Sequence, residues 1–352
     1  MTSKERVKTL LGGQLPDRPP LYDVIRNDAV IQHFGGEKLT SGNASDVVRY
    51  AHVNALDATK SFYKLPDFNA GQTIVLSSGR ETTRPRWTSW REHKVYESTE
   101  DYVRAKSKVT ADPWDWTYAD QLGLDNSIAS WVAMDKKSGD IVRDFHFPGP
   151  PRLDGIFPEV GLMAFSYYMA DCPDIIHRQI DYRFEKVVQA IEHSDLPEEA
   201  LVVSEACDIA YKSGLLFSPD FLRKSFIPGY TRVCDAAHGK GRKVLFHSDG
   251  NLWEILDDLV TAGIDILHPV EPLAGMEPGE IHRRYPHLIL CGTIDVSQLL
   301  PFGTPQEITD QVLRNIEATE GKIMVGSSTE VNNEVPLENY LALHETVLGY
   351  TY

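Results

Sequence analysis

The second half of the chain alternates short apolar runs with longer stretches of helical periodicity. Leu252, Ile255, Leu256 and Leu259 follow the i, i+3, i+4, i+7 spacing of one helix face. The apolar runs between such stretches predict five strands, which are Ala200–Ser204, Lys243–His247, Asp265–His268, Leu288–Cys291 and Lys322–Gly326. This alternation is typical of parallel strands joined by crossover helices.

Helix start signals support the same interpretation. Thr304 to Glu307 forms a capping box with proline at the first helical position, and Ser218-Pro219 opens another helix. Five successive βα units favour either a barrel or a doubly wound sheet. Because the G-x-G-x-x-G fingerprint of dinucleotide binding is absent, we expect an α/β fold with a single (β/α)₈ TIM barrel. The expected domain organisation is one domain over residues 1–352.

The first half of the chain is less regular. Pro19–Ile25 is a candidate first strand, and Ile141–Phe147 is a candidate strand followed by a proline-rich turn. Gly71–Ser98 has alternating apolar residues and two tryptophans, which predicts a β-hairpin excursion. The apolar positions of 176–191 predict a long amphipathic helix.

Composition narrows the functional classes. The chain has 35 Lys and Arg against 51 Asp and Glu, a formal charge of −16, which repels nucleic acid and anionic membranes but suits a basic partner protein. There is no run of about 18 apolar residues and no signal-peptide pattern at the start, so we expect a cytoplasmic protein. The 4 cysteines are scattered, as in a reducing compartment. The oligomeric state stays open, a homodimer included.

Residues that carry chemistry follow the predicted strands. In a barrel, catalytic groups come from the carboxyl ends of the strands and the loops after them. These positions hold Glu205, Cys207, Asp208, Tyr211, Lys212, His247, Asp249, His268, Glu271, Cys291, Asp295 and Glu330. Imidazole, thiol and carboxylate groups on one rim can bind zinc, or can form an acid/base cluster without a metal.

Several of these residues, and three aromatic residues elsewhere, also have a structural interpretation. His247 could be a hydrogen-bonded strand-end residue, and Cys291 a buried apolar one. Glu271 and Asp249 could cap helices, and Glu205 could pair with a lysine. Tyr22, Trp87 and Trp90 could be packing residues. The convergence of the whole set is a stronger argument than any single member.

Several segments resemble the uroporphyrinogen decarboxylase superfamily. They are Arg6–Pro20, Leu216–Pro219, Pro228–Tyr230, Phe246–Asn251, Cys291–Asp295 and the closing Gly326–Asn339. The resemblance covers nearly the whole chain and implies one (β/α)₈ barrel. True decarboxylases of the superfamily carry an arginine-rich R-Q-A-G-R segment that binds many carboxylates. Here the corresponding stretch offers only Arg26, which argues against that activity.

The other branch of the superfamily comprises methyltransferases that work with a small corrinoid protein. Members that act on coenzyme M use a zinc motif H-x-C followed much later by a second cysteine. This chain keeps His247 but has Asp249 in place of the first cysteine and Thr329-Glu330 in the region of the second. Carboxylates in place of thiolates harden a zinc site and suit it to an oxygen leaving group.

The resemblance therefore implies a corrinoid-dependent methyltransferase of the O-demethylase type. It would move a methyl group from a small methoxylated substrate, an aryl methyl ether for example, to the Co(I) corrinoid (cobalamin) of a partner protein. The expected cofactor is Zn²⁺, held by His247, Asp249, Glu271 and Cys291. The expected catalytic residues are His247, Glu205, Asp208 and Tyr211, and the expected substrate contacts are Tyr22, Asp23, Trp87, Trp90, Asp295 and Glu330.

Two alternatives stay open. One is a metal-independent decarboxylase or lyase of a small carboxylic acid that uses carboxyl groups for proton transfer. The other is a non-catalytic corrinoid- or tetrapyrrole-binding barrel.

Overall fold

The computed structural model describes residues 1–60, 63–76, 81–88, 92–148 and 153–352. A parallel sheet of five strands lies at its centre, in the order β11-β10-β9-β8-β5. The strands are β5 (Val202–Ala206), β8 (Lys243–His247), β9 (Ile266–His268), β10 (Ile289–Cys291) and β11 (Ile323–Met324). These are the five strands that the apolar runs predict, so the α/β class with a parallel sheet is confirmed.

Further parallel pairs extend both edges of this sheet. β1 (Ala58–Thr59) pairs with β4 (Val142–Arg143). Single-residue parallel bridges join Leu21 to Val325, Tyr22 to Ala58 and Phe145 to Val203. The two strands predicted in the first half of the chain therefore exist as these short pairings. One apolar cluster, which also includes Val7 and Leu10 of α1 (Ser3–Leu11), takes at least one side chain from each of these segments.

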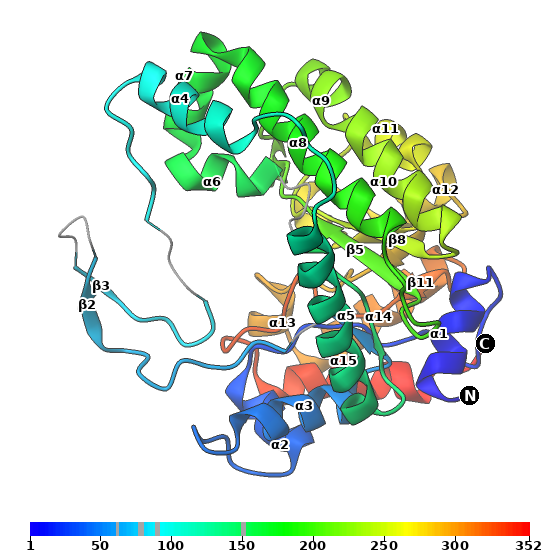
Figure 1. The fold of residues 1–352 in the computed structure, drawn as a ribbon. Helices are drawn as coiled ribbons and strands as arrows, with labels where there is room; N and C mark the ends of the chain where they lie inside the picture. Colours follow the sequence, from blue (N-terminus) through cyan, green and yellow to red (C-terminus); the bar gives the residue numbers. More distant parts are fainter. Residues whose placement is uncertain (61–62, 77–80, 89–91, 149–152) are drawn as a thin grey trace.

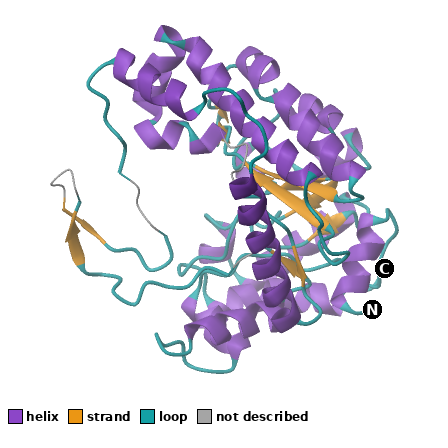
Figure 2. Ribbon diagram, in the orientation of Figure 1, coloured by secondary structure: helices purple, strands orange, loops and turns teal. Residues whose placement is uncertain are grey.

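Helices alternate with the strands and pack around the sheet (Figure 2). In chain order they are α8 (Pro173–Glu192), α9 (Pro219–Ser225), α10 (Ile227–Gly239), α11 (Leu256–Ala262), α12 (Pro278–Arg284), α13 (Leu299–Phe302), α14 (Pro305–Ala318) and α15 (Leu337–Gly349). The predicted start signals are confirmed. Thr304 and Glu307 form the capping box of α14, and the Ser218 hydroxyl accepts the Phe221 N–H at the start of α9.

The first half of the chain carries most of the additional elements. These are α2 (Asp28–Gly35), α3 (Ala44–Ala55), β2 (Thr73–Val75), β3 (Glu81–Thr83), α4 (Thr99–Val109), α5 (Tyr118–Ser138), α6 (Phe157–Val160) and α7 (Leu162–Asp171). β2 and β3 pair antiparallel, which confirms the predicted hairpin. Figure 1 shows the hairpin projecting away from the helices that surround the sheet. A second hairpin, β6 (Ala210–Tyr211) with β7 (Gly214–Leu215), follows β5.

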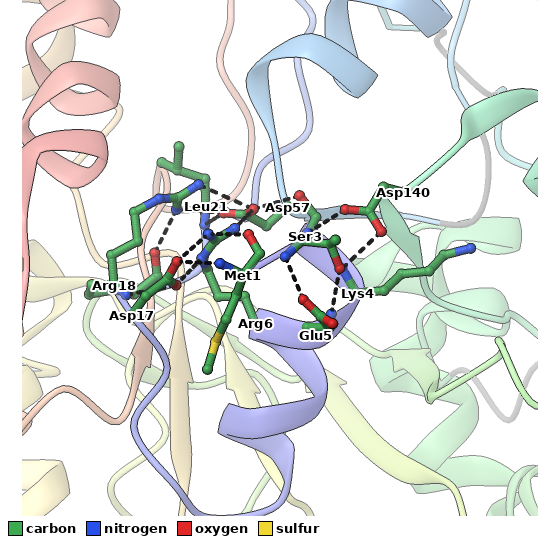
Figure 3. Close-up of polar contacts among 12 residues, drawn as sticks. Met1, Ser3, Lys4, Glu5, Arg6, Asp17, Arg18, Leu21, Asp57 and Asp140 are labelled. Atoms are coloured by element: carbon green, nitrogen blue, oxygen red, sulfur yellow. Dashed lines mark hydrogen bonds and ion pairs between the residues drawn. The ribbon is translucent and has the colours of Figure 1, made fainter.

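A buried polar network fixes the start of β1 (Figure 3). The Asp57 carboxylate accepts hydrogen bonds from Arg6 Nη1 and Arg18 Nη1, both at 2.7 Å, and from the Leu21 N–H at 2.8 Å. The Ser3 hydroxyl adds a fourth donor. Asp57 therefore ties helix α1 and the first strand segment to β1.

No helix in the described part of the chain is both long and apolar enough to cross a membrane.

Candidate metal centre

Two histidines end neighbouring strands at the centre of the site. His247 is the last residue of β8, His268 is the last residue of β9, and the two are paired in register. Parallel strands present their carboxyl ends at one edge of a sheet. Asp208, two residues beyond β5, and Asp249, two residues beyond β8, therefore lie near them, as the sequence predicts.

Asp208, His247 and Asp249 form a compact group of potential ligands. One ligand atom from each lies within 4.8 Å of the others. His247 Nε2 is 3.6 Å from an Asp208 carboxylate oxygen and 4.0 Å from an Asp249 oxygen. These two distances are longer than a hydrogen bond. The His247 ring therefore lies close to both carboxyl groups without a hydrogen bond to either in this pair of contacts. His247 is buried, whereas the two carboxyl groups are partly exposed.

The other ring nitrogen of His247 is held by His268. The two Nδ1 atoms are 2.7 Å apart and the rings stack at 4.9 Å. Burial lowers the pKa of His268 well below its ordinary value, so His268 is neutral. If its Nδ1 accepts, the His247 Nδ1–H donates, and the Nε2 lone pair of His247 points toward the carboxylates. That is the tautomer a metal-binding histidine needs, with its other nitrogen anchored.

The position of Asp249 beside other acidic groups changes its pKa. Burial and the nearby charges of Asp208 and Glu271 raise its pKa to about 7. Its Oδ1 is buried and has no hydrogen-bond partner among the described residues. Thr329 lies close to the Asp249 carboxyl group and opposes this rise in its pKa. Thr329 adopts a φ of 98°, which is strained for a β-branched residue. A carboxylate with an unsatisfied buried oxygen beside a second carboxylate is stabilised by a proton or by a cation.

The loop after β8 is held by hydrogen bonds to the loop after β9 and to the hairpin after β5. We call this arrangement the clamp around Gly250. The Gly250 N–H donates to Glu271 at 2.6 Å, and the Asn251 N–H donates to the Tyr211 carbonyl at 3.0 Å. Gly250 has φ +94°, and a Cβ there would lie 2.5 Å from the Tyr211 backbone nitrogen. Only glycine fits this position, and the contacts hold Asp249 in place.

The donor set fits a divalent metal. One imidazole nitrogen and two carboxylate oxygens would supply three protein ligands, the number found in catalytic zinc sites, which leaves a fourth position for a substrate. The other two predicted ligands are not in this group. Glu271 instead accepts the Gly250 N–H and raises the pKa of Asp249. Cys291 lies in the apolar cluster between the strands, fully buried, and burial raises the pKa of its thiol well above its ordinary value.

The remaining predicted residues are spread around the same end of the strands. Glu205 is buried on β5, and Tyr211 is exposed on β6. The Tyr22 ring packs edge-on against His268 at 5.1 Å, and its buried hydroxyl has no hydrogen-bond partner in the described part of the chain. Asp23 accepts bonds from the Ser327 N–H and hydroxyl, and burial raises its pKa to about 6.

Three predicted substrate contacts have structural partners. Asp295 accepts the Gln298 and Leu299 N–H groups at the start of α13. Glu330 forms an ion pair with Arg26 at 2.6 Å. Trp87 is buried in the core, and its indole N–H donates to Asp28. Trp90 lies outside the described residues.

Sequence reasoning missed two charged residues at this end of the sheet. Lys60 directly follows β1 and Asp144 directly follows β4, and the Asp144 N–H donates to the Thr59 carbonyl. The rule that functional residues follow the carboxyl ends of barrel strands, here called the strand-end rule, applies to both residues. However, β1 has only two residues and no apolar run from which the sequence could predict a strand. The sequence predicts His268 on the rim without a role, and its hydrogen bond to His247 supplies one.

Comparison of the chain with known proteins identifies its family and a solved structure of similar fold. The family model described as uroporphyrinogen decarboxylase (URO-D) matches residues 169–350, more than half of the chain. A search of curated proteins found no match to this chain. Among solved structures, the chain is similar to a methyltransferase from Methanosarcina mazei, with 17% sequence identity, a TM-score of 0.66, and 98% of each chain covered. At that identity the likeness concerns the fold.

Proposed function

The chain belongs to the uroporphyrinogen decarboxylase family, and from this premise we propose that it is a corrinoid-dependent methyltransferase. It moves a methyl group from a small methoxylated substrate to the Co(I) corrinoid of a partner protein. Its parallel segments close into a (β/α)₈ barrel, and the reaction takes place at the carboxyl ends of the strands. The fold shared with the Methanosarcina methyltransferase over 98% of both chains supports this choice.

The observation that carries the proposal is the Asp208–His247–Asp249 group, with His247 anchored by His268. These three residues would hold zinc. When bound, zinc would supply a Lewis acid that stabilises negative charge on the ether oxygen as the methyl group departs. Because carboxylates are harder ligands than thiolates, two carboxylates would make the zinc better suited to bind an oxygen atom.

The protein's own residues do the positioning. His268 fixes the ring orientation and tautomer of His247, and the clamped loop at Gly250 holds Asp249 beside Asp208. Tyr22 packs beside His268, and its buried hydroxyl has no hydrogen-bond partner among the described residues. Glu205 and Tyr211 lie on the strand and hairpin next to Asp208, where they are placed to shape the pocket or to move a proton.

A second candidate is a metal-independent lyase or decarboxylase of a small acid. One observation favours it. Asp249 has a pKa of about 7 and Asp23 a pKa of about 6, and carboxyl groups tuned to neutrality are suited to general acid catalysis. Activity with CO₂ release that survives exhaustive chelation would select this alternative.

The test combines metal content with methyl transfer. We expect about one zinc per chain by elemental analysis, and formation of methylcobalamin, followed by its absorption spectrum, when the protein is mixed with cob(I)alamin and methoxyarenes. His247→Ala and Asp249→Asn should lose both metal and transfer. His287→Ala, which removes an exposed histidine, should lose neither. If metal is absent and no donor in a broad panel methylates cob(I)alamin or a carrier protein, the proposal is wrong.

A further inference from the structure

A cavity of about 450 Å³ lies between helices α4, α5 and α8, which are labelled in Figure 1. Its lining comes from these helices, from the turn before α5, and from Pro148 in the segment after β4. Pockets for small molecules have volumes of about 300–1,000 Å³, so this cavity is large enough for a ligand. Its described lining includes none of Asp208, His247 and Asp249, and it is therefore a place separate from the candidate metal centre.

Helix α8 contributes one polar face to the cavity. Gln179, Tyr182, Arg183 and Lys186 line it, and they have the i, i+3, i+4, i+7 spacing of residues that share a helix face. The opposite face of α8 supplies buried apolar side chains to the largest apolar cluster of the molecule. The amphipathic pattern of α8 therefore directs its polar groups into the cavity.

Two lysines bring ammonium groups to the cavity. Lys106 of α4 is 8% exposed, and its Nζ donates to the Glu159 carboxylate. Lys186 of α8 donates to the Asp115 carbonyl at 2.8 Å and to the Asp120 carboxylate at 3.0 Å. An ammonium group has three N–H donors. Two donors of Lys106 and one of Lys186 therefore have no acceptor within the part of the chain that the structure describes.

The charges around the cavity do not balance. Arg183 is a third cation in the lining, and its Nη2 donates to the Gly155 carbonyl at 3.1 Å. Asp120 is the one acid among the described lining residues, and Glu159 pairs with Lys106 from outside the lining. Three cations against these two acids leave a net charge of +1, in a chain whose net charge is −16. A single anionic group would neutralise the cavity and accept the remaining N–H groups.

The rest of the lining is aromatic or apolar. Trp116 directly precedes the first turn of α5, and Tyr182 lies on α8. Lys186 Nζ is 5.8 Å from the centre of the Trp116 ring, so a positive charge and an aromatic surface lie side by side. Further apolar surface comes from Val109, Ala119 and Pro148. A flat aromatic ring that carries one carboxylate would use both kinds of surface.

We propose that the cavity between α4, α5 and α8 binds an aromatic monocarboxylate. Its ring lies against Trp116 and Tyr182, and its carboxylate accepts hydrogen bonds from the lysine ammonium groups. The alternative is that water alone fills the cavity and completes these hydrogen bonds, in which case the charge of an added aromatic molecule has no effect. The proposal does not depend on the methyltransferase activity.

Binding is measured by titration calorimetry on the full chain, with 2-naphthoate and its neutral isostere 2-naphthamide as probes. We expect the carboxylate to bind at least about tenfold more tightly than the amide, which corresponds to about 1.4 kcal/mol. Lys106→Gln and Lys186→Gln should each remove most of this preference. Lys108→Gln, which removes an exposed lysine of α4 outside the lining, should leave it unchanged.

A second pair of variants leaves every contact described above in place. Gly123 of α5 lines the cavity, and a Cβ there would meet no atom within 4 Å. Gly123→Gln and Gly123→Glu add side chains of the same size that differ by one charge, and both residues form helices more readily than glycine. At low salt, the glutamate variant should bind 2-naphthoate more weakly than the glutamine variant, with equal affinity for 2-naphthamide.

The outcomes separate a built anion site from a water-filled space. Absence of binding, or equal affinity for acid and amide, overturns the proposal. Folded lysine variants that keep the full preference overturn it too, because the carboxylate would then lie elsewhere. Circular dichroism shows whether each variant is folded. If the lysine variants unfold, the Gly123 pair decides, and equal affinity of its two members for 2-naphthoate refutes the site.

Discussion

Replacing Asp57 by asparagine removes the charge at the centre of the network in Figure 3 while it keeps the shape of the side chain. Asp57 is 1% exposed. Burial opposes its charge, but the hydrogen bond and charge of Arg18, together with the hydrogen bonds from the Leu21 N–H and the Ser3 hydroxyl, outweigh that effect and lower the pKa of Asp57. The substitution therefore leaves Arg6 and Arg18, both largely buried, facing an amide.

The expected loss of stability follows from these contacts. Breaking a buried ion pair by removing one partner costs about 3–5 kcal/mol. Arg6 keeps its bonds to Asp17, and the Arg18 side chain is 13% exposed, so we expect Asp57→Asn to cost about 3 kcal/mol, the lower end of that range. An alanine at the same position should cost more, because the Leu21 N–H and the Ser3 hydroxyl would also lose their acceptor.

Urea unfolding, followed by tryptophan fluorescence and far-ultraviolet circular dichroism, measures the free energy of unfolding. Asp17→Asn is the matched control. It removes another carboxylate bound to Arg6, but that carboxylate is 40% exposed, and exposed ion pairs contribute less than about 1 kcal/mol. A loss at Asp57 no larger than the loss at Asp17 would refute the reasoning.

Three further predictions concern the pH response, the packing and the metal site. Burial lowers the pKa of His52 from 6.5 to about 4, so the unfolded chain binds a proton that the folded chain does not. The contribution of His52 to stability is therefore complete above pH 6.5 and falls by up to about 3 kcal/mol as the pH drops toward 4. In urea unfolding curves measured at pH 7 and 4.5, His52→Gln should remove this part of the pH dependence and so make the slope shallower than in the unmodified chain. Gly326→Ala would place a Cβ 1.7 Å from the Tyr22 carbonyl oxygen and should cost about 1–3 kcal/mol in the same assay, whereas Gly239→Ala, with open space around it, should not destabilise. His268→Gln should weaken zinc binding by about 10- to 100-fold in a competition titration with a chromogenic chelator, and unchanged affinity would show that the histidine pair does not orient the site.

The sequence predicts the second half of the fold well because apolar runs there alternate regularly with helical patterns. Each of the five runs has between two and four adjacent apolar residues, and the capping box at Thr304 marks a helix start by local chemistry alone. β1 and β4 have two residues each, and their strand character comes from pairing with partners distant in the chain. Lys60 was missed for that reason.

The candidate site was predicted in part for a related reason. The strand-end rule placed Asp208, His247 and Asp249 at one edge, and the structure groups them. Cys291 also ends a strand, yet it pairs with Met324 and packs in the apolar cluster. Periodicity indicates which face a side chain occupies, but its depth depends on the stagger between strands.

The clamp around Gly250 has a practical consequence for anyone who wishes to redirect this protein to other substrates. Residues 247–251 are enclosed by backbone and carboxylate contacts from two neighbouring loops, so a library that varies them would mostly return unfolded clones. The strands β2 and β3 are by contrast largely exposed. Variation at their exposed positions would leave the supporting frame untouched.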